Sequence, residues 1–236
     1  MDIIIPLGKS KIGFLDLKYV LRAIEKYASG YDEIIIIGEK PQWIQGVVHL
    51  PFEDHPRPEW KERNIYNKIV HAFSYENITD DVFFMNDDHL LLNEIDIENY
   101  PYYYKGSCYG SMLKNSSSYR KTMHHTKKLL ERRGFEDINA DIHTPIIFNK
   151  KEFLSTFEPE HWLTPWGYGV KSLYCAFNRK PMTFMEDLKI HKKLSLQEIE
   201  ALVEGRHMVS CTDAPLKAGL GELLELRFPD KSSYER

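Results

Sequence analysis

Two short runs of isoleucine most constrain the fold of this chain. The first, DIIIPLG, occupies residues 2–8, and the second, EIIIIGE, occupies residues 33–39. Runs of four to eight β-branched residues followed by a turn residue are typical of buried strands. Strands buried on both faces occur almost only in sheets that helices cover on both sides. The two runs therefore predict an α/β protein.

The segments around these runs alternate between the patterns of helices and strands. A helix is expected from Asp16, which can cap it, to Gly30, and another over residues 61–76. Further strands are expected over residues 47–52 and 82–85. Strands that alternate with helices in this way predict a mostly parallel, Rossmann-like sheet flanked by helices.

The second half of the chain is expected to elaborate the same sheet. Residues 141–148 have the pattern of a strand, and residues 170–178 that of a helix. A helix over residues 195–205 begins with Ser195 followed by Glu198, which is the pattern of a capping box. No internal repeat separates this half from the first, so a single domain is predicted.

Two adjacent carboxylates, Asp87 and Asp88, follow the expected strand VFFM. Carboxylates between apolar segments are costly to bury unless they hold a partner. A divalent cation such as Mn²⁺ or Mg²⁺ prefers oxygen ligands, and it would neutralise the diphosphate of a nucleotide-sugar as a Lewis acid. The alternative is a turn that one of the two carboxylates caps. The buried context favours the metal site.

Other polar residues are expected near this pair, because ligands of parallel sheets bind beyond the carboxyl ends of the strands. Asn86 would support the carboxylates. A helix face with Asn64 and Lys68 can point at the same edge. For these two residues, as for Lys9 and Lys40, a solvated surface is the alternative. The residues predicted to contact a nucleotide-sugar are Pro6, Leu7, Gly8, Lys9, Glu39, Lys40, Asn64, Lys68 and Asn86.

A histidine at the start of the expected strand 141–148 is a candidate catalytic group. Strand alternation would place Asp141 and His143 on the same side, with the rigid Pro145 after them. A histidine near a metal or phosphate can act as a general acid/base or as a metal ligand; a structural histidine is the alternative. Asp213 is a further acid/base candidate. The predicted catalytic residues are therefore His143, Asp141 and Asp213.

Aromatic residues of the second half are candidates for binding an acceptor. The tyrosines at 100–109, with Trp162, Trp166 and Tyr168, either form a stacking floor or fill the core. Tyr103, Trp166 and Tyr168 are the acceptor contacts predicted among them.

The basic stretch 114–133 has seven lysines and arginines against one acidic residue, Glu131. It indicates either a solvated helix face or a site for an anionic acceptor such as a phosphorylated glycan, a lipid phosphate or nucleic acid. The net charge of −4 and the pI of about 6.2 do not indicate a bulk nucleic-acid binder.

The three cysteines have neither zinc-ligand spacing nor a disulfide framework. The N-terminal MDIIIPLGKSKIG lacks the pattern of a signal peptide, and the longest apolar run is far shorter than a membrane span. A cytoplasmic protein without a transmembrane segment is expected.

Several segments, taken in order, resemble the conserved regions of the Stealth proteins, bacterial sugar-phosphate transferases of capsular polysaccharide synthesis. LKYVLRAIEKYA, EIIIIGE, PQWI, RNIYNKIVHAF and FFMNDDHLL resemble the second region, with Asn64 in the place of a helix asparagine. IHTPIIFNKKEF resembles the third region, in which His143 takes the place of a histidine. VSCTDAP and LRFPDKSSYE resemble the fourth region, at whose positions Asp213, Ser232 and Glu235 stand.

The resemblance implies a GT-A-like fold, a nucleotide-sugar donor and a divalent metal. Residues 1–93 would be the nucleotide-sugar-binding half of one domain over residues 1–236, and residues 94–236 the acceptor and catalytic half. The first strand, IIIPLGKSKIG, lacks an acidic residue that the family carries in its first region. The predicted function is therefore transfer of a sugar to a hydroxyl of a glycan or other polar acceptor. Transfer of a sugar 1-phosphate and an inactive sugar- or nucleotide-binding module are the alternatives.

Overall fold

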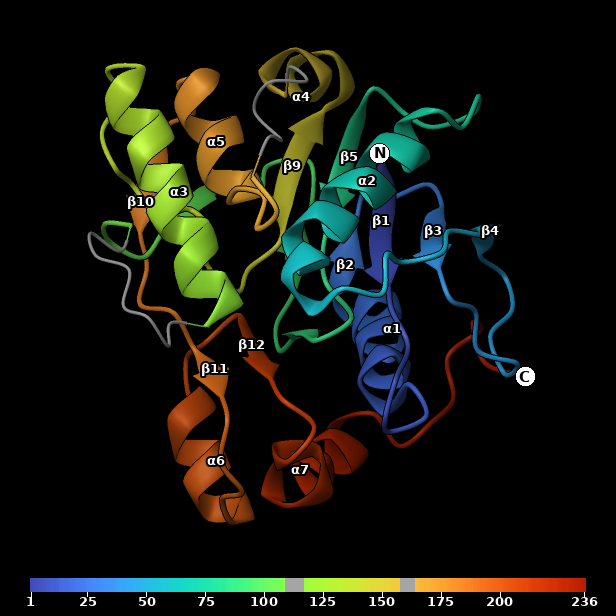
Figure 1. The fold of residues 1–236 in the computed structure, drawn as a ribbon. Helices are drawn as coiled ribbons and strands as arrows, with labels where there is room; N and C mark the ends of the chain where they lie inside the picture. Colours follow the sequence, from blue (N-terminus) through green and yellow to red (C-terminus); the bar gives the residue numbers. More distant parts are fainter. Residues whose placement is uncertain (109–116, 158–163) are drawn as a thin grey trace.

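The computed structural model describes residues 1–108, 117–157 and 164–236, and its centre is a five-stranded sheet with the order β4-β3-β1-β5-β9 (Figure 1). The strands are β1 (Asp2–Leu7), β3 (Ile34–Gly38), β4 (Val48–Leu50), β5 (Asp81–Phe84) and β9 (Ile146–Asn149). The first four are parallel, whereas β9 is antiparallel to β5. The predicted α/β fold with a mostly parallel sheet is confirmed.

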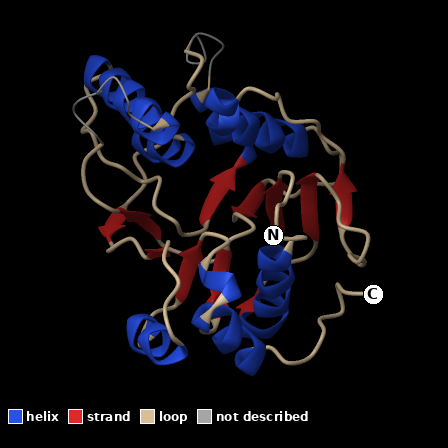
Figure 2. Cartoon of the chain, turned by 60° about the horizontal axis from the view of Figure 1, so that its bottom comes forward, coloured by secondary structure: helices blue, strands red, loops and turns tan. Residues whose placement is uncertain are grey.

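Helices cover both faces of this sheet (Figure 2). Alternate side chains of β1 enter separate cores, with Ile3 and Ile5 in one and Ile4 in the other, as the two-residue period of a strand requires. The first core is covered by α1 (Leu15–Tyr27), α6 (Leu196–Val203) and α7 (Gly219–Arg227). The second is covered by α2 (Lys61–Phe73), α3 (Ser118–Arg132), α4 (Lys150–Thr156) and α5 (Val170–Phe177).

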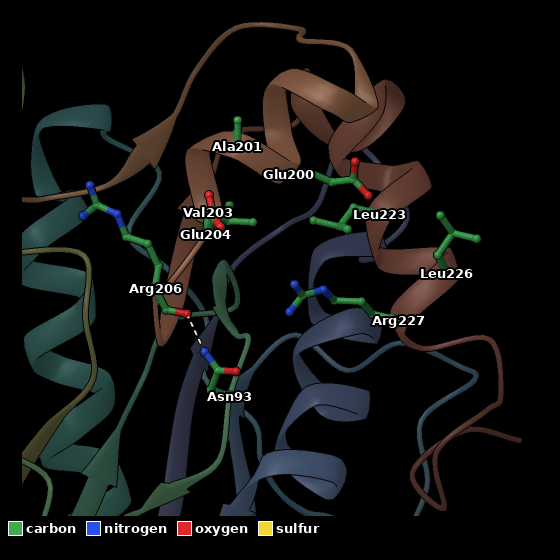
Figure 3. Close-up of a pocket in the computed structure, with 10 residues that line it drawn as sticks. Asn93, Glu200, Ala201, Val203, Glu204, Arg206, Leu223, Leu226 and Arg227 are labelled. Atoms are coloured by element: carbon green, nitrogen blue, oxygen red, sulfur yellow. Dashed lines mark hydrogen bonds between the residues drawn. The ribbon is translucent and has the colours of Figure 1, made fainter.

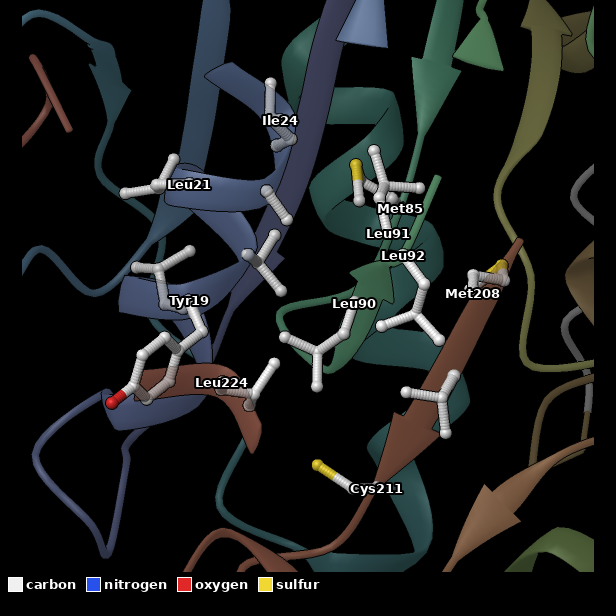
Figure 4. Packing of buried hydrophobic residues seen from close by; sticks show 14 of the residues in the cluster. Tyr19, Leu21, Ile24, Met85, Leu90, Leu91, Leu92, Met208, Cys211 and Leu224 are labelled. Atoms are coloured by element: carbon white, nitrogen blue, oxygen red, sulfur yellow. The ribbon is translucent and has the colours of Figure 1, made fainter. Parts of the chain in front are cut away.

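A three-stranded sheet extends the fold beyond the end of β5. It pairs β6 (His89–Leu91) with β12 (Met208–Cys211), and β12 with β11 (Lys189–Ile190). Leu90 of β6 packs in the first core with residues of α1 and α7 such as Leu224 (Figure 4). The remaining short elements are β2 (Ala28–Ser29), β7 (Ile95–Asp96), β8 (Tyr102–Tyr104), β10 (Met182–Phe184), η1 (Pro58–Trp60) and η3 (Pro215–Lys217).

Two predicted segment boundaries differ from the structure. The strand expected from residue 141 begins only at Ile146, because the carbonyls of Ile142 and Thr144 accept hydrogen bonds from the Lys171 ammonium instead of pairing in the sheet. Asp16 does not cap α1; Phe14 occupies the cap position, and the Asp16 carboxylate accepts a hydrogen bond from the N–H of Leu17. The capping box of Ser195 and Glu198 is confirmed.

Gly38 ends β3 in a conformation that side chains rarely adopt. Its φ is +118°, and a Cβ at this position would lie 2.1 Å from the carbonyl oxygen of Leu7. The missing side chain of Gly38 also leaves room for Lys68, whose Nζ donates to the Leu7 carbonyl at 2.8 Å. Lys68 thereby ties α2 to the end of β1, where ligands of parallel sheets bind.

The C-terminal residues are held against α1 by a buried ion pair. Nε and Nη2 of Arg22 donate to the two carboxylate oxygens of Glu235 at 2.6 and 2.8 Å, and Nη1 donates to the carbonyl of Phe228 at 2.7 Å. The N–H and hydroxyl of Ser232 bind the same carboxylate. Within the described ranges, no helix combines the length and apolar character needed to cross a membrane.

Candidate active site

A cavity of about 830 Å³ opens at the carboxyl ends of β1 and β5. Loops after both strands line it, as do the first turns of α2 and α3 and the segment that joins β10 to β11. Its size falls within the range of small-molecule sites. The residues predicted from the sequence that the structure brings together here are Pro6, Gly8, Asn64, Lys68, Asn86, Asp87, Asp88, Asp141, His143 and Asp213.

The other predicted site residues do not line this cavity. Leu7 and Tyr168 are buried in the two cores, with only 1% and 4% of their surfaces exposed, so neither side chain can contact a ligand there. Trp166 packs against the Lys121 ammonium, 4.3 Å from its ring centre. The residues placed outside the cavity are Leu7, Lys9, Glu39, Lys40, Tyr103, Trp166 and Tyr168. Tyr109, Lys114 and Trp162 lie outside the described residues.

The turn between β5 and β6 presents the two adjacent carboxylates. The carbonyl of Asn86 accepts a hydrogen bond from the N–H of His89 at 3.2 Å, and the N–H of Asn86 donates to Nδ1 of His89 at 3.2 Å. Burial lowers the pKa of His89 well below its ordinary value, so the ring is neutral. Since Nδ1 accepts, the proton is on Nε2. The buried ring thus fixes the turn that carries Asp87 and Asp88.

Asp88 is held as an anion by groups from the three-stranded sheet. Its Oδ2 accepts from the Lys189 ammonium at 2.7 Å and from the Ser210 hydroxyl at 2.8 Å. Burial alone would raise the pKa of Asp88, but the charge of Lys189 and the hydrogen bonds from Lys189 and Ser210 outweigh it and hold the pKa below its ordinary value. Its Oδ1 is buried and has no hydrogen-bond partner in the described part of the chain. That oxygen is free to bind a ligand.

A third carboxylate, Asp16, joins this pair from the first turn of α1. Burial raises the pKa of Asp16 to about 6, and the Asp88 and Asp213 carboxylates add to the shift. Burial likewise raises the pKa of Asp87 to about 8, with further contributions from Asp16 and Asp88. The acidic cluster, defined as Asp16, Asp87 and Asp88, therefore contains mutually repelling carboxylates. The sequence interpretation gave Asp16 only a capping role, because no local sequence pattern shows that Asp16 lies near the end of β5 in the fold.

The cavity as a whole carries an excess of negative charge. Among the described residues that line it, nine have carboxylates and five are lysines. The carboxylates are Asp16, Asp54, Glu59, Glu62, Asp87, Asp88, Asp141, Asp187 and Asp213, and the lysines are Lys61, Lys68, Lys105, Lys171 and Lys189. An anionic ligand such as a diphosphate would be repelled by this charge unless a cation accompanied it.

The described residues contain no group of three or more histidine, cysteine, aspartate or glutamate side chains arranged to hold a metal ion. A metal ion bound here would therefore have at most two of these side chains as ligands. Mg²⁺ commonly binds through one or two carboxylates and takes its other ligands from substrate phosphates and water. The free Oδ1 of Asp88 and the carboxylate of Asp87 fit a site of that kind.

His143 forms a pair with Asp187, which the sequence interpretation missed. Nδ1 of His143 lies 2.8 and 3.0 Å from the two carboxylate oxygens of Asp187, which also accepts from the N–H of His143 at 3.1 Å. Lys105 binds the same carboxylate at 2.7 Å. Burial lowers the pKa of His143 below its ordinary 6.5, and Lys189 and Lys105 add to this, while Asp187 opposes it. The ring is therefore neutral at pH 7, with Nδ1–H donated to Asp187 and Nε2 left as a base.

Asp141 was predicted to be catalytic, but its carboxylate is engaged at the N-terminus of α5. It accepts from the N–H groups of Lys171 and Ser172 at 3.3 and 3.2 Å and from the Ser172 hydroxyl. Gly169 allows this contact, since a Cβ there would lie 2.2 Å from Asp141 Oδ2. Asp141 thus satisfies helix N–H groups that have no partner within the helix. The structure gives it a capping role.

Replacing Asp141 by alanine is expected to lower the free energy of unfolding by about 2 kcal/mol, because it removes a helix cap and leaves buried donors unpaired. Urea unfolding followed by circular dichroism measures this change. Asp213→Ala is the matched control, since Asp213 is exposed and its replacement should change stability by less than about 0.5 kcal/mol. Equal stability of the two variants would contradict the capping role.

Asn64 and Lys68 line the cavity, but their polar groups also hold neighbouring segments. The side-chain amide of Asn64 exchanges two 3.1 Å hydrogen bonds with the main chain of His55. Lys68 is 3% exposed and pairs with Asp54 at 2.8 Å as well as with the carbonyl of Leu7. Asn64 thereby holds the loop before α2 to that helix, and Lys68 ties the same loop to the end of β1, so both shape the cavity wall.

A separate groove of about 660 Å³ lies between α6 and α7 (Figure 3). Leu226, which is 68% exposed, and Arg227 of α7 line one side, and Glu200 and Glu204 line the other. At its edge, the side-chain amide of Asn93 donates to the carbonyl of Arg206 at 2.8 Å. None of the residues that line this groove also lines the cavity at the strand ends.

Comparisons with known proteins identify no family for this chain. No family model matches it, and no curated protein matches it. Among solved structures, it is similar to a glycosyltransferase involved in the glycosylation of the major capsid of PBCV-1, with 13% identity, a TM-score of 0.45, and 95% of this chain and 98% of that chain covered. A likeness at this level carries no argument about function, which depends on the cavity itself.

Proposed function

We propose that the chain is a metal-dependent glycosyltransferase that moves a sugar from a nucleotide-sugar to a hydroxyl group. The observation that carries this proposal is the shared cavity, in which the acidic cluster and the His143–Asp187 pair meet at the carboxyl ends of parallel strands. The acidic cluster suits a cation that accompanies a diphosphate, and the His143–Asp187 pair suits a hydroxyl group that must lose a proton.

The acidic cluster supports a divalent cation for two reasons. Burial is the main cause of the raised pKa values of Asp16 and Asp87, and repulsion between the carboxylates adds to it; a cation would relieve that repulsion. Asp88 also offers one buried oxygen, Oδ1, that accepts no hydrogen bond within the described residues. Mn²⁺ or Mg²⁺ bound by Asp87 and Asp88, with Asn86 in support, would supply a Lewis acid for the diphosphate.

The His143–Asp187 pair would act on the acceptor. Nε2 of His143 takes the proton of the acceptor hydroxyl while its oxygen bonds to the anomeric carbon of the donor sugar. The bond between that carbon and the diphosphate oxygen breaks, and the nucleoside diphosphate leaves with the bonding electrons. Asp187 keeps Nδ1 protonated, so that Nε2 is the nitrogen available as a base.

Transfer of a sugar 1-phosphate is the second candidate, and Asp16 is the observation that favours it. The first strand ends in Pro6-Leu7-Gly8 without the acid of the Stealth first region, but Asp16 brings a carboxylate into the cavity soon after that strand. The same base would then direct the hydroxyl at the β-phosphorus, and a nucleoside monophosphate would leave. An inactive binding module would share the cavity and release no nucleotide.

Turnover of UDP-, GDP-, CMP- and dTDP-sugars with Mn²⁺ tests the proposal. We expect at least one UDP-, GDP- or dTDP-sugar to be hydrolysed slowly in a metal-dependent way, with the nucleoside diphosphate as product. Release of the monophosphate from such a diphosphate donor would instead establish sugar-phosphate transfer. Binding without turnover would establish the inactive module. The absence of both turnover and binding would refute a nucleotide-sugar site.

Replacing Asp88 by asparagine is expected to weaken Mn²⁺-dependent binding of the nucleotide by about 100-fold or more, because the carboxylate that would hold the cation loses its charge. Isothermal titration with and without Mn²⁺ measures the effect. Asp80→Asn is the control, since this exposed carboxylate lines neither this cavity nor the other pockets. Unchanged Mn²⁺-dependent binding by the Asp88 variant would contradict the metal assignment.

A further inference from the structure

A second pocket, of about 430 Å³, lies directly behind the catalytic histidine. His143 lines this pocket and the larger cavity, and no other described residue lines both. Its volume is sufficient for a ring or a short sugar chain. Of its lining, the sequence interpretation included Tyr100 and Tyr103 among the tyrosines that could form an acceptor floor, and predicted Tyr103 as an acceptor contact.

The wall between the two cavities is an extended segment whose side chains alternate. Asp187 and Lys189 line the larger cavity, whereas Glu186 and Leu188 line the second pocket. This is the two-residue period of an extended chain. The two cavities meet at the His143 side chain, which lines both, and the segment 186–189 divides them elsewhere. His143 is therefore reached from both sides.

The floor of the second pocket suits a flat and uncharged group. Tyr100 and Tyr103 meet edge to face with their ring centres 5.8 Å apart, and both line the pocket. Met185, Leu188 and Met208 add apolar surface. Aromatic floors of this kind pack against rings and against the apolar faces of sugars.

Charges at the rim disfavour an anionic ligand. Glu94, Asp96 and Glu186 line the pocket and are exposed. Arg206 lies beside them and donates to Glu186 at 2.8 Å, so these two charges offset each other and the carboxylates of Glu94 and Asp96 remain. The basic helix α3 does not line this pocket. An acidic rim around an aromatic floor selects against phosphorylated or polyanionic acceptors.

We infer that the second pocket binds the acceptor, which is a neutral glycoside or a neutral aryl-bearing sugar, with its ring on Tyr103 and its reactive hydroxyl at His143. This inference rests on the proposed function, since it names the acceptor class for the same site. It decides against the anionic acceptor that the basic stretch 114–133 suggested.

Binding of two matched probes tests the inference. 4-Nitrophenyl β-D-glucoside and 4-nitrophenyl β-D-glucuronide share the ring and differ by one carboxylate. We expect the glucoside to bind at millimolar concentration and about tenfold more tightly than the glucuronide, measured by ligand-observed NMR. Tyr103→Ala and the pocket-filling Met185→Trp should each weaken glucoside binding about tenfold. Leu226→Trp, in the groove between α6 and α7, should not change it.

Each result decides for or against the pocket. Absent glucoside binding, equal or tighter glucuronide binding, or unchanged binding in both pocket variants would overturn the inference. Circular dichroism of Tyr103→Ala and Met185→Trp shows whether the variants are folded, and the wild-type comparison of the two probes needs no variant. Donor turnover by the wild-type protein is measured separately. If the protein prefers the glucoside but turns over no donor, the proposed function is refuted and a neutral-glycoside site remains. If it turns over a donor but does not prefer the glucoside, only the inference about the pocket is refuted.

Discussion

Glu235→Ala is expected to lower the free energy of unfolding by about 3–5 kcal/mol, since it leaves the buried guanidinium of Arg22 without its partner. The side chains of this pair are only 8% and 5% exposed. Arg22 would keep the carbonyl of Phe228 as an acceptor, which cannot neutralise its charge. With a total stability of about 5–15 kcal/mol for a typical domain, the loss would be large. Urea unfolding at low temperature measures it.

An exposed pair provides the control for this prediction. Arg206 and Glu186 also form an arginine–glutamate contact at 2.8 Å, but Glu186 is 79% exposed. Glu186→Ala should therefore cost less than about 1 kcal/mol. Similar losses for Glu235→Ala and Glu186→Ala would contradict the assigned role of the buried pair.

The stabilisation by Glu235 should also depend on pH in a defined direction. Burial would raise the pKa of Glu235, but the hydrogen bond from Arg22 outweighs it and holds the pKa below its ordinary 4.5. A carboxyl whose pKa is lower in the folded state stabilises the fold fully above the unfolded value. The difference between wild type and Glu235→Ala should therefore be constant above about pH 5 and shrink as the pH falls below 4.5.

His143→Ala is expected to lower kcat/KM for sugar transfer by about 10²–10⁴-fold, the usual contribution of a positioned general base. Asp187→Asn should lower it by at least about 10²-fold, because the asparagine no longer holds Nδ1 protonated and Nε2 free. The acceptor is the neutral glycoside identified by binding, and the donor is the one found by turnover. His71→Ala, on α2 but outside the cavity, should leave the rate unchanged.

Two further measurements separate a catalytic role of His143 from a structural one. Burial lowers the pKa of His143 below 6.5, so the neutral base persists at pH 7 and kcat/KM should fall only when the pH drops below 6.5. Added imidazole should restore part of the activity of His143→Ala. A rate that neither falls in the variants nor shows an acid limb below pH 6.5 would exclude His143 as the base.

The regular elements of the fold were predictable because their patterns are local. The isoleucine runs that became β1 and β3, and the capping box of Ser195, depend on neighbours a few residues apart. The strand expected over residues 141–148 was shorter than predicted, because Lys171, 27 and 29 residues further along, captures the carbonyls of Thr144 and Ile142. Short pairings such as β6 with β12 have no local signature, since each strand is only a few residues long.

The residues that meet at the site were only partly predictable. Asp141 and His143 were predicted to lie at the site, and both line the cavity. The strand that was expected to place them side by side begins only after them, at Ile146. Their partners decide their roles. Asp141 is committed to the N-terminus of α5, whereas His143 pairs with Asp187 and keeps one nitrogen available.

The sequence by itself determined the parallel strands, the position of Asp87 and Asp88 at the end of one of them, and the candidate histidine. These features follow from periodicity and from the cost of burying charge. Only the tertiary structure decided which side chains surround them. Asp187 lies 44 residues from His143, and Lys189 and Ser210 lie 101 and 122 residues from Asp88. Contacts over such separations depend on how the whole chain packs around the sheet, which no local pattern encodes.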